Sequence, residues 1–304
     1  MSNRITPAMI TGSTLNDINS SLAALERTTN ELSSGKTILE PSDNPYGASR
    51  VIELQSQLDG LSSYATNTQE GIDWESTASS AMSSMGNVLQ SVRELLVQSS
   101  NGTYNQSDRE SIATQVEQLT EAVKQDANTQ YAGQYVFSGT MTTTAPYVQG
   151  AEDTYQGDSG TVTRAVGPGV SVDVSTEISS LLGNGQASGD GKLLDTLRTI
   201  SEHLKGGTSE DVSALGSSDL EKLEASIEEL TQLQATSGSV TDQLQTAASR
   251  IEGLQASITA TLSNTRDANI AETSIAYSNE QAAYEAALRA GASIVQESLL
   301  QFLQ

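Results

Sequence analysis

The stretch TLNDINSSLAALERTTNEL, residues 14–32, carries the strongest structural signal in this chain. Its apolar residues recur at steps of three and four, the spacing of a helix face that packs against a partner helix. We interpret this face as an N-terminal assembly seam on a helix that spans about residues 14–34. With Thr29 in the same register, the seam residues are Leu15, Ile18, Leu22, Leu25 and Leu32.

A second seam with the same spacing lies near the other end of the chain. Free chain ends usually fray, so apolar seams at both ends indicate helices that pair with each other or with other copies. A helical bundle within one chain, without any assembly role, is the simpler alternative. The C-terminal seam comprises Leu244, Ile251, Leu254, Ile258, Tyr284, Leu288, Val295, Leu299 and Phe302.

Between the two seams the sequence pattern changes from helix to strand. Two short segments flank Gly167-Pro-Gly169 with the period of a strand, which predicts a β-hairpin. In one, Val162, Arg164 and Val166 form one face, and in the other, residues 170–174, valines alternate with Ser171 and Asp173. Residues 135–140 are also strand-like. Further helices are predicted over about residues 46–99, 107–130 and 192–204, and from about 218 to the C-terminus with a joint at 263–269.

These elements predict a mainly α fold with a β-rich insertion, arranged as an elongated helical rod with paired terminal coiled-coil helices and a small outward β domain. The domain boundaries follow from the pattern changes. We expect a terminal helical assembly domain at 1–45 and 264–304, a helical rod domain at 46–130 and 191–263, and a β-rich outer domain at 131–190.

Local signals refine the helix ends. Residues 1–11 are predicted to form a polar arm, and Pro41 and Pro45 interrupt any helix across the segment between them. Ser107 with Glu110 matches a capping box at the start of a helix. Asp153 lies in a polar, glycine-containing segment that we interpret as a turn.

Composition excludes several classes of partner. The formal charge of −23 disfavours binding to nucleic acid and to anionic membrane surfaces, which are themselves negative. No apolar run reaches the roughly 20 residues needed to cross a bilayer, so membrane insertion is not expected. The N-terminal residues lack the apolar core of a cleaved secretory signal.

The residues of the common catalytic and metal sites are scarce. The chain has no cysteine and one histidine, His203, so a catalytic triad or a histidine-cluster metal site cannot form. We expect His203 to lie on the surface. The glutamates around residues 221–229 lie opposite an apolar helix face and are predicted to be solvated. We therefore predict no catalytic residue, no cofactor and no metal site.

Two segments that flank the first loop resemble a known signature. Leu32-Ser-Ser-Gly-Lys36 followed by Pro41-Ser-Asp-Asn-Pro45 resembles the N-terminal motif of the flagellin superfamily. The Asp-Asn-Pro variant and the ending Ser298-Leu-Leu-Gln-Phe-Leu303 are similar to its hook-associated protein 3 branch, the hook–filament junction proteins. The motif-loop residues are Ser33, Gly35, Pro41, Asp43, Asn44 and Pro45.

This resemblance implies a flagellin-like fold and a non-enzymatic structural role. The chain would join hook to filament in the extracellular bacterial flagellum, after export through the flagellar type III channel without a cleaved signal. Its implied partners are its own copies in a helical lattice, flagellin, the first hook-associated junction protein, and an export chaperone on the C-terminal helix.

Two alternatives remain open at this point. A filament flagellin with a reduced outer domain would polymerise alone into long filaments. A type III secretion tip or translocator-like coiled-coil protein would bind membranes or host surfaces.

Overall fold

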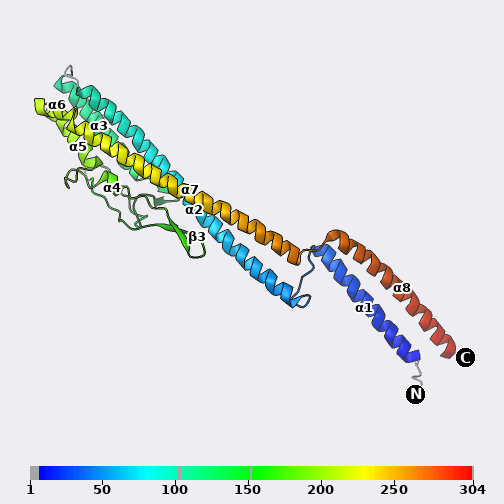
Figure 1. Ribbon diagram of the computed structural model, residues 1–304. Coiled ribbons are helices and arrows are strands. Elements are labelled where there is room, and N and C mark those ends of the chain that lie inside the picture. The colour runs from blue at the N-terminus through cyan, green and yellow to red at the C-terminus, as the bar shows by residue number, and fades with distance from the viewer. Residues whose placement is uncertain (1–6, 101–103, 151–152, 303–304) are drawn as a thin grey trace. The chain divides into compact units, whose positions relative to one another are not determined.

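A computed structural model describes residues 7–100, 104–150 and 153–302, with side chains described between residues 9 and 293 (Figure 1). Helices dominate, as predicted. The long helices are α1 (Pro7–Ser34), α2 (Pro45–Ser99), α3 (Gln106–Ala127), α5 (Leu193–Gly206), α7 (Ser218–Arg266) and α8 (Ile270–Phe302). The short elements are α4 (Ser179–Leu182), α6 (Ser209–Leu215), β1 (Gln130–Tyr131), β2 (Gln134–Tyr135), β3 (Thr163–Gly167) and β4 (Val170–Asp173).

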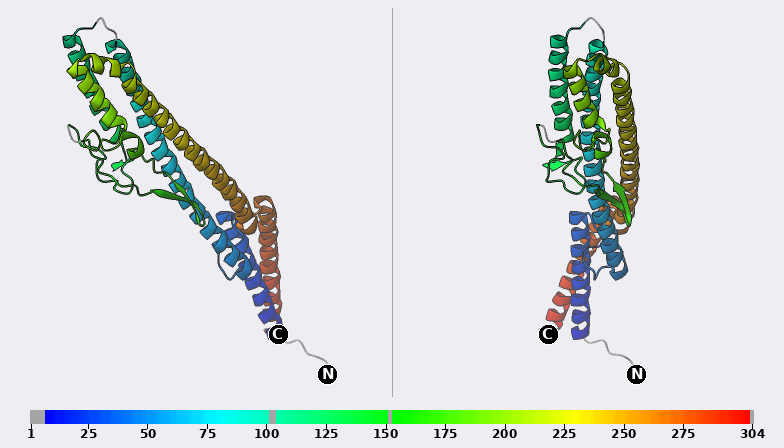
Figure 2. Two further views of the ribbon diagram at one scale, coloured as in Figure 1. Left: turned by 60° about the vertical axis from the view of Figure 1, so that its left-hand side comes forward. Right: turned by 90° about the vertical axis from the view of Figure 1, so that its left-hand side faces the viewer.

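The chain divides into two compact units. The terminal unit comprises residues 1–60 and 254–304, and the central unit comprises residues 61–253. Within the terminal unit α1 and α8 run side by side, the blue and red helices of Figure 2. The paired terminal helices inferred from the two seams are therefore confirmed, whereas the three-domain division of the sequence stays a prediction.

The central unit holds the continuous hydrophobic core. Helices α2, α3, α5 and α7 bury their apolar faces together, and the irregular segment between α3 and α5 covers part of them. Trp74 is buried edge-on against Tyr131, with ring centroids 6.2 Å apart, and the Arg164 guanidinium lies 5.9 Å from its ring centre. Large fully buried members include Met82, Met85, Leu89, Phe137, Tyr147, Leu194 and Leu197.

The predicted hairpin is confirmed. Strands β3 and β4 pair antiparallel with Arg164 opposite Val172, and Gly169 adopts a positive φ of 69° in the turn. The strand predicted at residues 135–140 is wrong beyond Tyr135. There side chains take the place of a strand ladder: Thr140 donates its N–H to Asp158, and the Tyr155 hydroxyl donates to the Phe137 carbonyl.

Several helix ends differ from their predictions. Helix α1 begins at Pro7 inside the predicted polar arm, because proline lacks the N–H that the first helical position leaves unpaired anyway. The capping box of α3 is Asn105 with Asp108, two residues earlier than the predicted pair. The predicted joint is confirmed between Arg266, where α7 ends, and Ile270, where α8 begins.

A buried carboxyl lies where α2 packs on α7. Glu75 is 1% exposed and accepts a hydrogen bond from the Ser237 hydroxyl. Burial raises the pKa of the Glu75 carboxyl to about 7, and the nearby charge of Asp173 adds to this increase. The carboxyl therefore titrates near neutral pH in the folded chain.

The thermal stability of the central unit is expected to fall as pH rises from about 5 to 8. Between the ordinary pKa of 4.5 and the folded value of about 7, the folded chain retains a proton that the unfolded chain releases. Above pH 7 the folded chain holds the Glu75 carboxylate buried and charged, whereas the unfolded chain exposes it to water. Circular dichroism melts of Glu75→Gln should show a flatter pH dependence than the parent chain, with exposed Glu224→Gln as control. Equal slopes for the Glu75 variant and the parent would contradict the assignment.

Candidate assembly site

The two terminal helices approach closely at a glycine. A Cβ atom added to Gly291 of α8 would lie 3.0 Å from Ile18 Cδ1 and 3.3 Å from Thr14 Cγ2 of α1. On α1 the half-buried face repeats at steps of three and four, as predicted, through Ile18, Leu22 and Leu25 to Leu32. The pair is thus formed by branched side chains on one helix against a small residue on the other.

The predicted seam residues divide into three groups by exposure. Half-buried in the single chain are Ile18, Leu22, Leu25, Leu32, Ile258 and Tyr284. Buried are Leu244 and Ile251, which pack within the chain itself, whereas Leu15, Leu254 and Leu288 are 56%, 46% and 43% exposed. Val295, Leu299 and Phe302 fall on α8, but their side chains lie outside the described part. The assembly role of the whole set stays a prediction.

Exposed apolar residues concentrate in the terminal unit. Of fourteen large exposed apolar side chains in the described part of the chain, ten belong to this unit, although it has far fewer residues than the central unit. The continuous buried core, by contrast, lies wholly in the central unit. Such an excess of exposed apolar residues is what the predicted assembly role of the terminal unit requires. The ten are Met9, Ile10, Leu15, Leu39, Tyr46, Ile52, Leu254, Ile270, Ile275 and Leu288.

The connection after α1 and the connection before α8 are held together. The Thr37 N–H and hydroxyl both donate to the Arg266 carbonyl, at 2.7 Å and 3.0 Å. The Ala268 N–H donates to the Gly35 carbonyl at 2.8 Å, so that Lys36 and Asp267 form an antiparallel bridge. These hydrogen bonds hold the connection after α1 against the connection before α8.

Two polar residues of the motif loop, Asp43 and Asn44, hold the backbone around them. The Asp43 carboxylate accepts the Glu40 and Leu39 N–H groups, at 2.9 Å each, and these two bonds lower the pKa of Asp43. The Asn44 side chain accepts the Gly47 N–H at 2.9 Å and so caps α2, whose first residue is Pro45. A side chain at position 47 would approach the Cδ1 atom of Ile38 to 2.5 Å.

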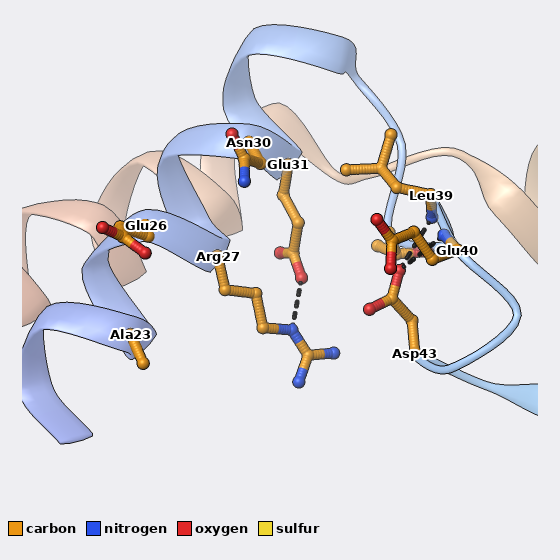
Figure 3. A pocket seen from close by; sticks show the side chains of 9 residues that line it. Ala23, Glu26, Arg27, Asn30, Glu31, Leu39, Glu40 and Asp43 are labelled. Carbon is orange, nitrogen blue, oxygen red and sulfur yellow. Dashed lines mark hydrogen bonds and ion pairs between the residues drawn. The ribbon is translucent and has the colours of Figure 1, made fainter. Parts of the chain in front are cut away.

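An open groove of about 290 Å³ separates this loop from the last turns of α1 (Figure 3). Arg27 donates to Glu31 at 3.0 Å on the helix side, and Glu40 and Asp43 lie on the loop side. One cation among several carboxylates makes the groove acidic. Across the described residues no cluster of histidines and carboxylates could hold a metal ion.

A buried ionic cluster in the central unit was not predicted. The Lys124 ammonium is fully buried and contacts Asp153 at 2.9 Å and the Gly150 carbonyl at 2.7 Å. Arg198 binds the same Asp153 at 2.8 Å and Glu121 at 2.9 Å. Burial raises the pKa of the Asp153 carboxyl, but hydrogen bonds from Arg198 and Lys124 outweigh it and hold that pKa below its ordinary value.

The prediction that Asp153 occupies a simple turn missed this cluster, because its partners are distant in sequence and carry no local pattern. The prediction for His203 was also incomplete. The ring is 29% exposed, and its Nδ1 lies 2.6 Å from the buried Asp219 carboxylate. The available signal was a histidine in the last turn of α5 together with an aspartate in the first turn of α7, two helices later.

The chain is similar in sequence to known flagellar proteins. Residues 5–142 match the bacterial flagellin N-terminal helical region. The chain is 32% identical over 207 residues to phase 2 flagellin of Salmonella typhimurium, covering 66% of this chain and 38% of the relative. It is 30% identical over 164 residues to flagellar hook-associated protein 3 of the same organism, covering 54% and 51%.

A solved structure shows the same fold. The flagellar junction protein FlgL of Legionella pneumophila superimposes with a TM-score of 0.58 at 15% identity, covering 72% of this chain and 100% of that one. The match to the two Salmonella typhimurium relatives spans about half of their length or less. No helix in the described ranges has the length and apolar character needed to span a membrane.

Proposed function

Because this chain belongs to the flagellin superfamily, we propose that it is a structural subunit of the bacterial flagellum that joins hook to filament. It acts by packing its terminal helices against neighbouring subunits, outside the cell, and catalyses no reaction. Contacts of the head-to-tail kind that do not close generate open tubes, which is what such a joint requires.

The observation that carries the proposal is the separation of buried core from exposed apolar surface. The central unit closes its own core, whereas the terminal unit exposes Leu15, Leu254 and Leu288. Burying such side chains contributes roughly 25 cal/mol for each Å² of apolar surface removed from water. A terminal unit of this kind gains most of its packing from its neighbours.

The choice of the junction role rests on two further features. The Asp43-Asn-Pro45 variant of the motif loop is similar to the hook-associated branch. The fold likeness to a flagellar junction protein supports the same choice. Its proposed partners are its own copies, flagellin on one side, the first hook-associated junction protein on the other, and an export chaperone on α8 before assembly.

Deletion of the gene in the source bacterium tests the proposal. We expect cells with hooks but no filaments, flagellin released into the medium, and loss of swimming, all restored by the intact gene. Negative-stain microscopy and immunoblots of the medium measure these outcomes. Normal filaments in the deletion strain would contradict a junction role.

A filament flagellin is the second candidate, because the match to phase 2 flagellin covers a larger share of this chain than the match to hook-associated protein 3. The purified protein would then polymerise alone into long filaments. A junction subunit is expected to remain short or unassembled under the same conditions.

A further inference from the structure

A groove in the central unit has an apolar floor and a cation at its rim. It measures about 400 Å³ and lies between the β3–β4 hairpin and α7. Val166, Val172 and Ala247 form its buried floor, while Val170 at the hairpin turn is 44% exposed. The groove is therefore shaped to receive one apolar side chain.

The positive charge of Arg250 lies at one end of this groove. Arg250 lines it with its guanidinium 3.7 Å from the Cβ position of Gly167, and has no ion-pair partner within 4.0 Å among the described residues. Asp242 lies at the other end of the groove, two helical turns earlier on α7. An apolar anchor with a carboxylate one turn away would match Arg250.

Within the described part of the central unit, one surface offers that combination. Besides Val170, the central unit exposes Val97, Met141 and Val148 as large apolar residues in its described part. Glu94 lies one turn before Val97 on the same face of α2, and no ion pair engages it among the described residues. Near Met141 the carboxylate of Asp158 is already bound by Thr140.

These two surfaces of one chain are too far apart to meet. The hairpin contacts α2 at Asn67, whose side chain donates to the Ala165 carbonyl at 3.3 Å, and at Gly71 (Figure 1). Val97 lies 26 residues after Gly71 on the same helix. At 1.5 Å per residue this is about 39 Å, so the contact requires two molecules.

We infer that the Val170–Arg250 groove of one copy binds the Val97–Glu94 face of a second copy. Val97 enters the groove against Val170, and Glu94 pairs with Arg250. The contact is head-to-tail, because the two faces differ, and the same step repeats from copy to copy. The inference rests on the proposed function, since it names one lattice contact of that subunit.

Cysteine pairs test the contact, because the chain has no cysteine of its own. A strain carrying Val97→Cys together with Val170→Cys is grown, and its flagella are isolated and oxidised. We expect a ladder of dimers, trimers and larger products on non-reducing gels. Each single variant, and the pair Val97→Cys with Met141→Cys, should give no ladder.

Charge reversal provides a second test of the contact. In the cysteine-pair background, Arg250→Glu or Glu94→Arg alone should remove the ladder, and the two together should restore it. Lys222→Glu, an exposed change on the same helix, should leave it intact. A motile cysteine-pair strain without a ladder would overturn this contact and leave the junction role standing. Normal filaments after gene deletion would overturn the role itself.

Discussion

Leu288→Asp is expected to abolish swimming and filament attachment while the purified subunit folds as the parent does. Leu288 is 43% exposed in the single chain, so a carboxylate there can reach water and destabilises the isolated subunit little. In the proposed lattice a neighbouring subunit covers Leu288 and excludes water from it. A buried, unpaired charge costs several kcal/mol, which a repeated contact cannot tolerate.

Swimming in soft agar, electron microscopy and circular dichroism of the purified variant measure this outcome. Met141→Asp is the matched control, because Met141 is equally exposed at 43% but belongs to the central unit. Leu254→Asp should behave like Leu288→Asp, since Leu254 is also exposed. Normal motility in both leucine variants would show that these faces are solvated in the flagellum.

Lys124→Ala is expected to destabilise the central unit by about 3–5 kcal/mol. The substitution leaves Arg198 as the remaining cation of Asp153, and as the remaining donor to the Gly150 carbonyl, at 3.1 Å in place of the 2.7 Å bond from Lys124. Removing one partner from a buried ionic cluster costs more than that partner contributes, because the Asp153 carboxylate stays desolvated with one of its two cations gone. The segment around Gly150 should detach from α3 before the helices themselves unfold.

Urea unfolding, with hydrogen exchange of residues 147–156, measures this effect. Lys192→Ala is the control, because Lys192 pairs with Glu229 at 3.5 Å with both side chains about 40% exposed. Such a surface pair contributes about 0–1 kcal/mol. Equal losses of stability for the two variants would show that the buried Lys124 cluster does not stabilise the central unit more than a surface ion pair does.

Periodic patterns made most of the fold predictable. Residues spaced by three and four marked α1, α2 and α7, and alternating valines marked β3 and β4, because each pattern reports which face is buried. The prolines at positions 41 and 45 were equally informative about the loop before α2, since their constraints are local. The start of α1 was missed because its first two turns precede Leu15, the first leucine of the three-and-four pattern.

The assembly site was only partly predictable for the same reason. Periodicity identifies an apolar face but not what covers it. Leu244 and Leu254 share one predicted seam, yet the first is buried within the chain and the second is 46% exposed. That difference depends on which neighbouring elements reach each turn of α7, and spacing along one helix holds no information about them.

The sequence by itself therefore determined the helices near both chain termini, the hairpin between them, the motif loop and the family resemblance, because these depend on neighbours within a few residues. Only the tertiary structure decided where apolar surface remains open and where charge is buried. The Lys124, Asp153 and Arg198 cluster and the Arg250 groove join residues from distant segments. Such contacts are set by how the helices pack, which no local pattern encodes.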